Sequence, residues 1–400
     1  MIEALWLAII ITLVFLAAAF LFLGWRWEST LSRPRPRGYK PAVSIIIPAY
    51  KSEKTIAETI KSAKASSYRN KEIIVVNDSQ DSTPKICSQL GVKIIQNRKR
   101  LGKAIALNRA VKKAKGEILF FLDSDTVMDR GCLSRLVPWF TKPDIGVVSP
   151  KYLAQKSKRI LPRLAALENN FNSSFFKADM FFGSMISIRG CGVAVRRDFF
   201  EKVGGWSETI VEDVDFAGKT LRAGYRIHYE PSAIVRTKES ETLKDLKSQR
   251  IRWGKGAAYS FLNYRSVYSK NTQFTLHFFP YIFLIFGVLG ILAWQIYIFI
   301  PIVLLYALYS FSAANFATIM LLLLIPLLYG FFAAVATGSL SHLTIVTWRE
   351  KESPGEIVLL IPYLFIYMPL VIFFYFRGMA SGFSSRRFTK KELDLKDWKC

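Results

Sequence analysis

The spacing of apolar and polar residues changes along the chain, and this change predicts its elements. From Lys40 to about Lys270, short apolar runs alternate with longer amphipathic segments. The short runs predict buried strands and the longer segments predict helices. The expected strands are Val43–Pro48, Glu72–Val76, Val92–Gln96 and Glu117–Leu122, and the expected helices are Glu53–Ala65, Lys103–Ala114 and Glu212–Ala223. Strands separated by helices predict an α/β, Rossmann-like domain with a mostly parallel sheet and helices on both faces.

Long apolar stretches at both ends of the chain predict membrane segments. Ala4–Leu23 is apolar and basic residues follow it. A secretory signal has a shorter apolar core of ~7–15 residues with positive charge before it, so we expect an uncleaved anchor. Asn271–Trp348 contains no Asp, Glu, Lys or Arg, and a spanning helix needs ~20 apolar residues. We expect spans at Phe274–Ala293, Trp294–Ser312, Asn315–Thr337 and Ile357–Phe376.

These stretches give a predicted domain organisation. It comprises a transmembrane anchor at 1–25, a Pro- and Arg-rich linker at 26–41, an α/β domain at 42–256, an interfacial segment at 257–273, about four membrane helices at 274–376 and a basic tail at 377–400. Basic residues flank membrane helices mainly on the cytoplasmic side. We therefore expect a multi-pass protein of the cell membrane, with its N-terminus outside and its α/β domain and tail in the cytoplasm.

The charge of the chain narrows the partners. Lys and Arg number 55 against 30 Asp and Glu, so the formal net charge is +25. Anionic membrane lipids and a phosphate-bearing substrate suit such a surface. The basic residues are scattered and form no nucleic-acid motif, so we expect no nucleic-acid partner. None of the four cysteines forms a CxxC pair, so neither a zinc site nor a disulfide framework is indicated.

Acidic residues follow two of the expected strands. Asp78 comes after Glu72–Val76, and Asp123 and Asp125 come after Glu117–Leu122. Ligands of open α/β sheets bind at the carboxyl ends of the strands. Side-chain direction repeats every two residues in an extended segment, so Asp123 and Asp125 are expected on one side. The pair suits contact with a ribose and with Mg²⁺ or Mn²⁺ held against a diphosphate. The alternative is a solvated turn.

Two further groups of residues each allow an ordinary explanation. Glu212 and Asp213 open an expected helix, where acids favour the helix dipole. They could also supply a general base. Gln249, Arg252 and Trp253 precede the apolar block, where Trp and Arg commonly anchor a chain at the membrane interface. An Arg also pairs well with phosphate, and a Trp offers a flat face to a sugar ring. For each of these two groups, the residues alone do not decide between the structural and the functional explanation.

Six segments occur in an informative order: SIIIPAY (44–50), VVNDS (75–79), LGKAIALN (101–108), FLDSD (121–125), VED (211–213) and QRIRW (249–253). This series resembles family 2 glycosyltransferases with a GT-A fold, over about Lys40 to Gly256. The likeness is closest to the membrane-embedded branch, which includes cellulose, chitin, hyaluronan and bacterial poly-N-acetylglucosamine synthases and ceramide glucosyltransferase. The chain departs from the usual pattern at Lys51 and Ser52, where the family has Asn and Glu, and at Asn77, where it has an acid.

The resemblance implies roles for individual residues. Those expected to bind the nucleotide are Tyr50, Asp78, Lys103 and Asp123. Asp125 is expected to hold Mg²⁺ or Mn²⁺. The catalytic pair is expected to be Glu212 and Asp213, with Asp213 as the base. The acceptor and the diphosphate are expected to meet Cys191, Gly192, Gln249, Arg252 and Trp253.

The expected activity is inverting transfer of a sugar from a UDP-linked donor to a polysaccharide. One alternative is transfer of a single sugar to a ceramide- or polyprenyl-type lipid. Another is a non-catalytic membrane transporter or receptor, although the expected spans have almost none of the charged residues that mark a substrate path. Two features were ambiguous in themselves. Arg159–Met180 predicts an amphipathic helix that lies either on the membrane or in the core. His228 follows a strand-like run and is either close to the metal or, as we expect, structural.

Overall fold

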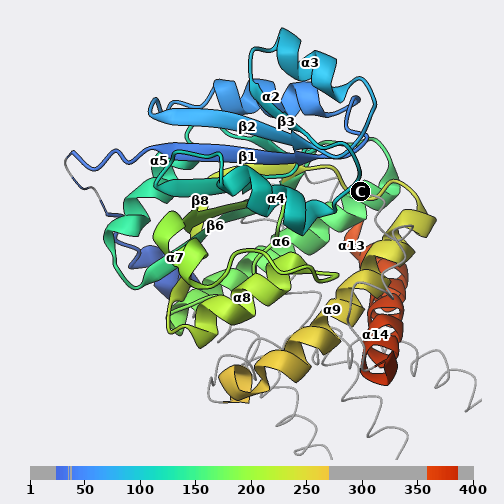
Figure 1. Cartoon of the computed structure of the whole chain (residues 1–400). Coiled ribbons are helices and arrows are strands. Elements are labelled where there is room, and N and C mark those ends of the chain that lie inside the picture. Colours follow the sequence, from blue (N-terminus) through green and yellow to red (C-terminus); the bar gives the residue numbers. More distant parts are fainter. Residues whose placement is uncertain (1–23, 35, 37, 270–357, 386–400) are drawn as a thin grey trace, which may run out of the picture.

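The computed structural model describes residues 24–34, 36, 38–269 and 358–385, and its centre is a mixed eight-stranded sheet (Figure 1). The strand order is β3-β2-β1-β4-β7-β6-β8-β5. The strands are β1 (Val43–Ala49), β2 (Lys71–Asn77), β3 (Lys93–Gln96), β4 (Ile118–Leu122), β5 (Val127–Met128), β6 (Ile145–Ala154), β7 (Gly192–Arg196) and β8 (Arg226–Thr237). The four expected strands correspond to β1 to β4, and the sequence analysis named no later strand.

Helices lie on both sides of this sheet, with α2 and α3 on one side and α6 and α8 on the other (Figure 1). Those up to residue 222 are α2 (Ile56–Lys64), α3 (Thr83–Gln89), α4 (Lys103–Val111), α5 (Cys132–Leu136), the 3₁₀ turn η1 (Val137–Thr141), α6 (Ile160–Phe181), α7 (Arg197–Lys202) and α8 (Glu212–Arg222). They are followed by α9 (Leu243–Ser269), α13 (Leu360–Pro362), the π-helical turn η2 (Tyr363–Tyr367) and α14 (Met368–Ser385). The three expected helices correspond to α2, α4 and α8.

The two halves of the sheet are built differently. β3, β2, β1 and β4 are parallel, as expected from their separation by helices. β7 runs antiparallel to both of its neighbours, β4 and β6. β8 is parallel to β6 and antiparallel to β5. The sheet is therefore mixed, because β7 enters it from the edge where β4 ends.

Helix α6 settles one ambiguous expectation. Its side chains Phe171 and Phe175 are buried with Leu360 and Tyr363 of the C-terminal helical segment. Phe176 is buried in the main core under the sheet. The helix therefore belongs to the core, and it joins the α/β domain to the C-terminal segment.

Helices α9 and α14 run side by side (Figure 1). Gly254 lies where they touch, because a Cβ added there would come within 2.0 Å of the backbone oxygen of Tyr375. The expected anchor and the first three expected spans fall outside the described residues. The fourth, Ile357–Phe376, is divided in the described part among α13, η2 and the start of α14. Within residues 24–34, 36, 38–269 and 358–385, no helix combines the length and the apolar character needed to cross a bilayer.

Candidate active site

The ends of three parallel strands form one edge of the sheet. Ala49 of β1 is in register with Asn77 of β2, and Ile46 of β1 is in register with Phe121 of β4. Both β1 and β4 are buried along nearly their whole length, so they lie inside the sheet with both faces covered. The residues that follow these strands are therefore brought to the same edge, as expected from the sequence.

Asp78 is held rigidly at this edge. Its carboxylate accepts hydrogen bonds from the backbone N–H groups of Leu101 and Gly102, both at 2.9 Å, and from Asn97 Nδ2 at 2.5 Å. The side chain fixes the turn that leads into α4. Lys103 is the first residue of that helix, so Asp78 also fixes the position of the Lys103 backbone.

Lys103 joins acids from two distant parts of the chain. Its Nζ lies 2.8 Å from Asp123 Oδ1 and 3.0 Å from Glu212 Oε1. Asp123 follows β4, whereas Glu212 opens α8. The lysine therefore neutralises two carboxylates that would otherwise repel each other. This arrangement places the expected nucleotide-binding and catalytic residues side by side.

Asp213 lies next to this ion-paired group and is held by backbone amides. Its Oδ2 accepts a hydrogen bond from the N–H of Gly190 at 2.9 Å, and its Oδ1 accepts one from Val214 at 2.8 Å. A Cβ at Gly190 would make tight contacts, 3.2 Å from Lys103 Nζ and 3.3 Å from Asp213 Oδ2. Any larger residue there would require these charged side chains to move by a few tenths of an ångström.

The segment from Gly190 to Gly192 reaches the site because β7 is antiparallel to β4. Leu122 is in register with Gly192, and the N–H of Asp123 donates to Cys191 O at 3.3 Å. The Tyr152 hydroxyl donates to Gly192 O at 2.7 Å and holds the segment from below. Burial raises the pKa of the Cys191 thiol well above its usual value, so the thiol is uncharged in this segment beside the acids.

The neighbouring acids Glu212 and Asp213 differ in their proton affinity. Burial and the Glu212 charge raise the pKa of Asp213 to about 6. Burial alone would raise the pKa of Glu212 too, but the Lys103 ammonium lowers it overall. Burial also raises the pKa of Asp123 to about 6, against the effect of Lys103. Environments that push the pKa values of adjacent acids apart are typical of acid–base sites.

Asp125 is the expected metal ligand. Burial raises its pKa, against the effects of Thr126, Lys103 and its own backbone N–H, and Thr126 Oγ1 donates to Asp125 Oδ1 at 3.2 Å. It forms no ion pair with any described residue. A half-buried carboxylate without an ion-pair partner is suited to Mg²⁺ or Mn²⁺, which prefer oxygen ligands and commonly take one or two carboxylates with phosphate. Within the described residues, no group of three or more His, Cys, Asp or Glu side chains forms a metal cage by itself.

The expected nucleotide contact Tyr50 follows β1, and its ring is covered by a cation. The guanidinium carbon of Arg100 lies 4.1 Å from the ring centroid. Arg100 comes from the loop before α4, so the loop that binds Asp78 also covers the tyrosine. Ser52, where the family pattern has an acid, is 2.8 Å from Ser124 Oγ and ties the end of β1 to that of β4.

Helix α9 carries the three residues expected to meet the diphosphate and acceptor. The charge of Arg252, on α9, contributes to lowering the pKa of Glu212, after the larger effects of Lys103. Trp253 instead stacks under Arg250, whose guanidinium carbon lies 4.0 Å from the ring centroid. The amide oxygen of Gln249 is buried without a hydrogen-bond partner among the described residues.

Arg250 is a residue that sequence reasoning missed. It is buried, and its Nη2 lies 2.5 Å from Glu168 Oε2 and 3.1 Å from the Tyr367 hydroxyl. It therefore ties α9 to α6 and to η2 directly behind Trp253. No local pattern distinguishes it from Arg252, because only the packing of the three elements shows which arginine turns inward.

Comparison with known proteins fits this geometry. Residues 44–204 match the family model described as glycosyl transferase family 2. The matched range contains the ends of β1, β2 and β4, Lys103 and the Gly190–Gly192 segment. The residues of α8 and α9 lie beyond this range, so their link to it rests on the contacts described above.

Relatives and solved structures extend the comparison. A poly-beta-1,6-N-acetyl-D-glucosamine synthase of Staphylococcus aureus (strain COL) is 30% identical over 225 residues, which are 54% of each chain. The Staphylococcus epidermidis protein of the same name is 29% identical over 222 residues, again 54% of each. The chain thus spans about half the length of these curated relatives. A mannosyltransferase of Pyrobaculum calidifontis, solved with GDP-Man and Mn²⁺, shares the fold with a TM-score of 0.56 at 18% identity, over 97% of this chain and 100% of that one.

Proposed function

We propose that the chain is an inverting glycosyltransferase that moves a sugar from a UDP-linked donor to a polysaccharide at the membrane. The observation that carries the proposal is the position of Lys103 between Asp123 and Glu212, with Asp213 beside them. Lys103 thus links Asp123, which follows β4, to the start of α8, which carries the candidate base Asp213.

Asp213 is the proposed general base. Its carboxylate takes the proton of an acceptor hydroxyl while that oxygen attacks the anomeric carbon and the diphosphate leaves with the bonding electron pair. A base with a pKa of about 6 is close to the pH at which it operates. The Gly190 and Val214 amides hold the carboxylate in place, and Glu212 stays ionised beside Lys103.

The leaving diphosphate needs positive charge. After Lys103, the charge of Arg252 on α9 also contributes to lowering the pKa of Glu212, and a guanidinium binds phosphate oxygens in pairs. Asp125, with Asp123 next to it, would hold Mg²⁺ or Mn²⁺. When bound, the ion would supply charge that stabilises the departing diphosphate.

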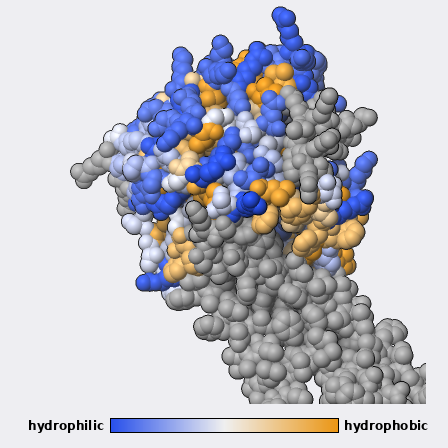
Figure 2. Space-filling model, turned by 60° about the horizontal axis from the view of Figure 1, so that its bottom comes forward, coloured by the Kyte–Doolittle hydropathy of each residue, from blue (hydrophilic) through white to orange (hydrophobic). Residues whose placement is uncertain are grey.

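A membrane location is part of the proposal, and the sequence supports it. The uncharged block from Asn271 to Trp348 is long enough for three crossings. In the described residues, Phe373, Phe376 and Phe383 leave one side of α14 apolar and exposed. Figure 2 shows that hydrophobic residues gather near one end of the molecule, while the opposite end is largely hydrophilic. We infer that α9 and α14 lie on the membrane side of a cytoplasmic catalytic domain.

The relatives support a polysaccharide acceptor, because they are named poly-beta-1,6-N-acetyl-D-glucosamine synthases. UDP-N-acetylglucosamine is therefore the first donor to test, with GDP-mannose as the rival, since the structural relative was solved with GDP-Man. The full chain would be incubated with each labelled donor and Mn²⁺. A ladder of long products supports a polysaccharide synthase, whereas a single organic-soluble product supports transfer to a lipid.

The mechanism is tested by Asp213→Asn. Because the variant keeps the shape of the side chain but lacks the base, we expect turnover to fall by about 10²–10⁴-fold while donor binding is retained. Initial rates and donor affinity are measured on the same preparation. Asp198→Asn is the matched control, because Asp198 has a side chain that is 77% exposed. Full activity of Asp213→Asn would contradict the assignment.

A further inference from the structure

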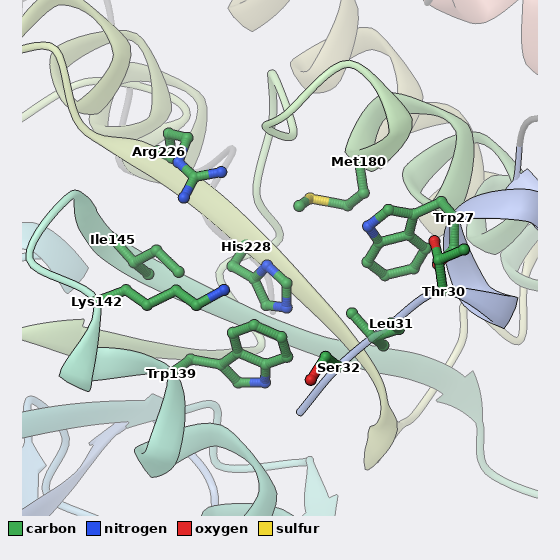
Figure 3. Close-up of a pocket in the computed structure, with 10 residues that line it drawn as sticks. All are labelled: Trp27, Thr30, Leu31, Ser32, Trp139, Lys142, Ile145, Met180, Arg226 and His228. Atoms are coloured by element: carbon green, nitrogen blue, oxygen red, sulfur yellow. The ribbon is translucent and has the colours of Figure 1, made fainter. Parts of the chain in front are cut away.

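A second cavity, of about 250 Å³, lies apart from the candidate active site. The segment 24–34 forms one wall through Trp27 and Leu31, and the sheet and its connections form the other through Trp139, Lys142 and His228. In Figure 3 the imidazole of His228 lies at the centre of this group, with Lys142 and Arg226 on one side and Trp27 on the other. None of these residues takes part in the proposed transfer.

His228 supplies a polar group without a partner. The residue is 4% exposed, its ring centroid is 3.6 Å from that of Trp139, and its Nε2 has no hydrogen-bond partner among the described residues. Buried polar atoms in native proteins nearly always have such a partner. The free nitrogen therefore indicates that the cavity holds a ligand with a polar group.

The charges around the cavity favour an anion. Arg226 pairs with Asp144 at 2.5 Å, and Arg33 pairs with Glu230 at 3.1 Å. Lys142 has no carboxylate partner in the described residues, and its Nζ lies 4.9 Å from the centroid of the Trp139 ring. One positive charge is thus left over at the mouth of the cavity.

The positive charges around the cavity also act on His228. Burial lowers the pKa of His228 well below its usual value, and the charges of Lys142, Arg226 and Arg33 lower it further. An anion bound among them would reverse part of this effect and let the imidazole donate a hydrogen bond. The cavity is therefore unfavourable for a cation and favourable for a phosphate.

The other wall of the cavity favours an amphiphile. Trp27 and Leu31 present apolar surface to the same space. Trp25, two residues before Trp27, is 48% exposed, and Phe181, at the end of α6, is 45% exposed. Exposed tryptophan is typical of a chain that meets the headgroup layer. A ligand with a phosphate at one end and an apolar body at the other matches both walls.

We propose that this cavity binds the phosphate group of an anionic membrane lipid. Lys142 and His228 contact the phosphate, and Trp27 and Leu31 contact the glyceryl and first acyl carbons. The inference rests on the proposed membrane location of the chain. The segment 24–34 then forms one wall of a lipid site at the bilayer surface.

The test uses the full chain, purified in detergent and stripped of lipid. Three probes are titrated and retention is followed by native mass spectrometry: short-chain phosphatidylglycerol, the matching diacylglycerol without phosphate, and inorganic phosphate. We expect only phosphatidylglycerol to bind well. Two variants should each weaken phosphatidylglycerol binding by about tenfold or more, because each removes a charged or charge-assisted contact. These are Lys142→Gln, at an exposed position, and His228→Phe, which keeps an aromatic ring against Trp139. Lys61→Gln on α2 is the control and should bind as the parent does.

Three results would overturn the proposal: unchanged binding in Lys142→Gln, equal binding of diacylglycerol, or equal binding of inorganic phosphate. The last result would show an anion site without a lipid. Sugar transfer is assayed on the same preparation, so the two proposals fail separately. Lys142-dependent lipid binding without sugar transfer would reject only the proposed function.

Discussion

At the scale of single residues, Lys103 decides how the candidate site is charged. It is the one cation placed within 3.0 Å of both Asp123 and Glu212 among the described residues. Through its charge it also opposes the rise in the pKa of Asp213. The lysine thus reduces the repulsion among three neighbouring carboxylates, of which Glu212 is buried and Asp123 and Asp213 are half-buried. Its effect on Asp213 links a residue of the nucleotide side to the proposed base.

This link predicts the pH dependence of Lys103→Gln. The parent should lose kcat/KM as the pH falls through about 6, because Asp213 then gains a proton and ceases to be a base. Without the ammonium the pKa of Asp213 rises further, so the acidic limb moves to higher pH. A rise of one pKa unit would reduce the fraction of free base at pH 6 from about one half to about one eleventh, so activity at that pH should fall by about fivefold or more.

The measurement is a pH profile of kcat/KM for Lys103→Gln and for Lys112→Gln, an exposed lysine just beyond α4. The control should keep the profile of the parent. An acidic limb that stays in place in Lys103→Gln, even with reduced activity, would show that Lys103 binds substrate without tuning the base.

The sequence predicts site roles for Asp78, Asp123 and Asp213 from local rules. The first two come directly after apolar strands, and the third opens a helix. The contacts that make a site of them could not be derived in that way. Lys103 meets Glu212, and Gly190 meets Asp213, only through the pairing of β4 with β7 and the docking of α8.

At the scale of elements, the expected strands and helices of the first half were confirmed because each strand is a short apolar run and each helix an amphipathic segment between polar breaks. β6 and β8 were missed for a physical reason. Pro150 and Pro231 interrupt them, and their pairing carries register shifts at Ile145/Val147 and Pro150/Lys151. Proline within a run argues against a strand. The mixed half of the sheet was therefore invisible to periodicity.

The junction of α6, α9 and η2 gives a prediction for Arg250. Replacing it by Met leaves Glu168 buried without its cation, and breaking a buried pair in this way costs about 3–5 kcal/mol. We therefore expect Arg250→Met to lower the free energy of unfolding strongly. It should also reduce turnover, because Trp253 loses the guanidinium that covers it.

The double variant Arg250→Met/Glu168→Met separates charge from packing. If the cost comes from the unpaired carboxylate, the double variant recovers most of the stability, because replacing both partners by apolar residues is often neutral. Arg265→Met, an exposed position on the same helix, should change stability by no more than about 0.5 kcal/mol. Thermal unfolding in detergent measures all four proteins. A double variant as unstable as Arg250→Met would assign the cost to the arginine's packing.

At the scale of the whole molecule, the α/β domain and the C-terminal segment 358–385 pack on each other. The packing of α6 on this segment and of α9 on α14 joins them. The candidate active site on the sheet edge and the apolar, exposed side of α14 therefore belong to one packed unit. This arrangement suits the proposed acceptor at the membrane and the proposed donor in the cytoplasm.

The membrane orientation is the last prediction. The basic residues after Ala4–Leu23 and those of the tail, such as Arg386 and Lys390, should keep both regions in the cytoplasm. A fluorescent protein fused to the C-terminus in a bacterial host should therefore fluoresce, and alkaline phosphatase at the same site should be inactive. Phosphatase fused before Met1 should be active, because an anchor of this charge pattern leaves the N-terminus outside. The reverse pattern at the C-terminus would place the tail outside and require an odd number of crossings after the catalytic domain.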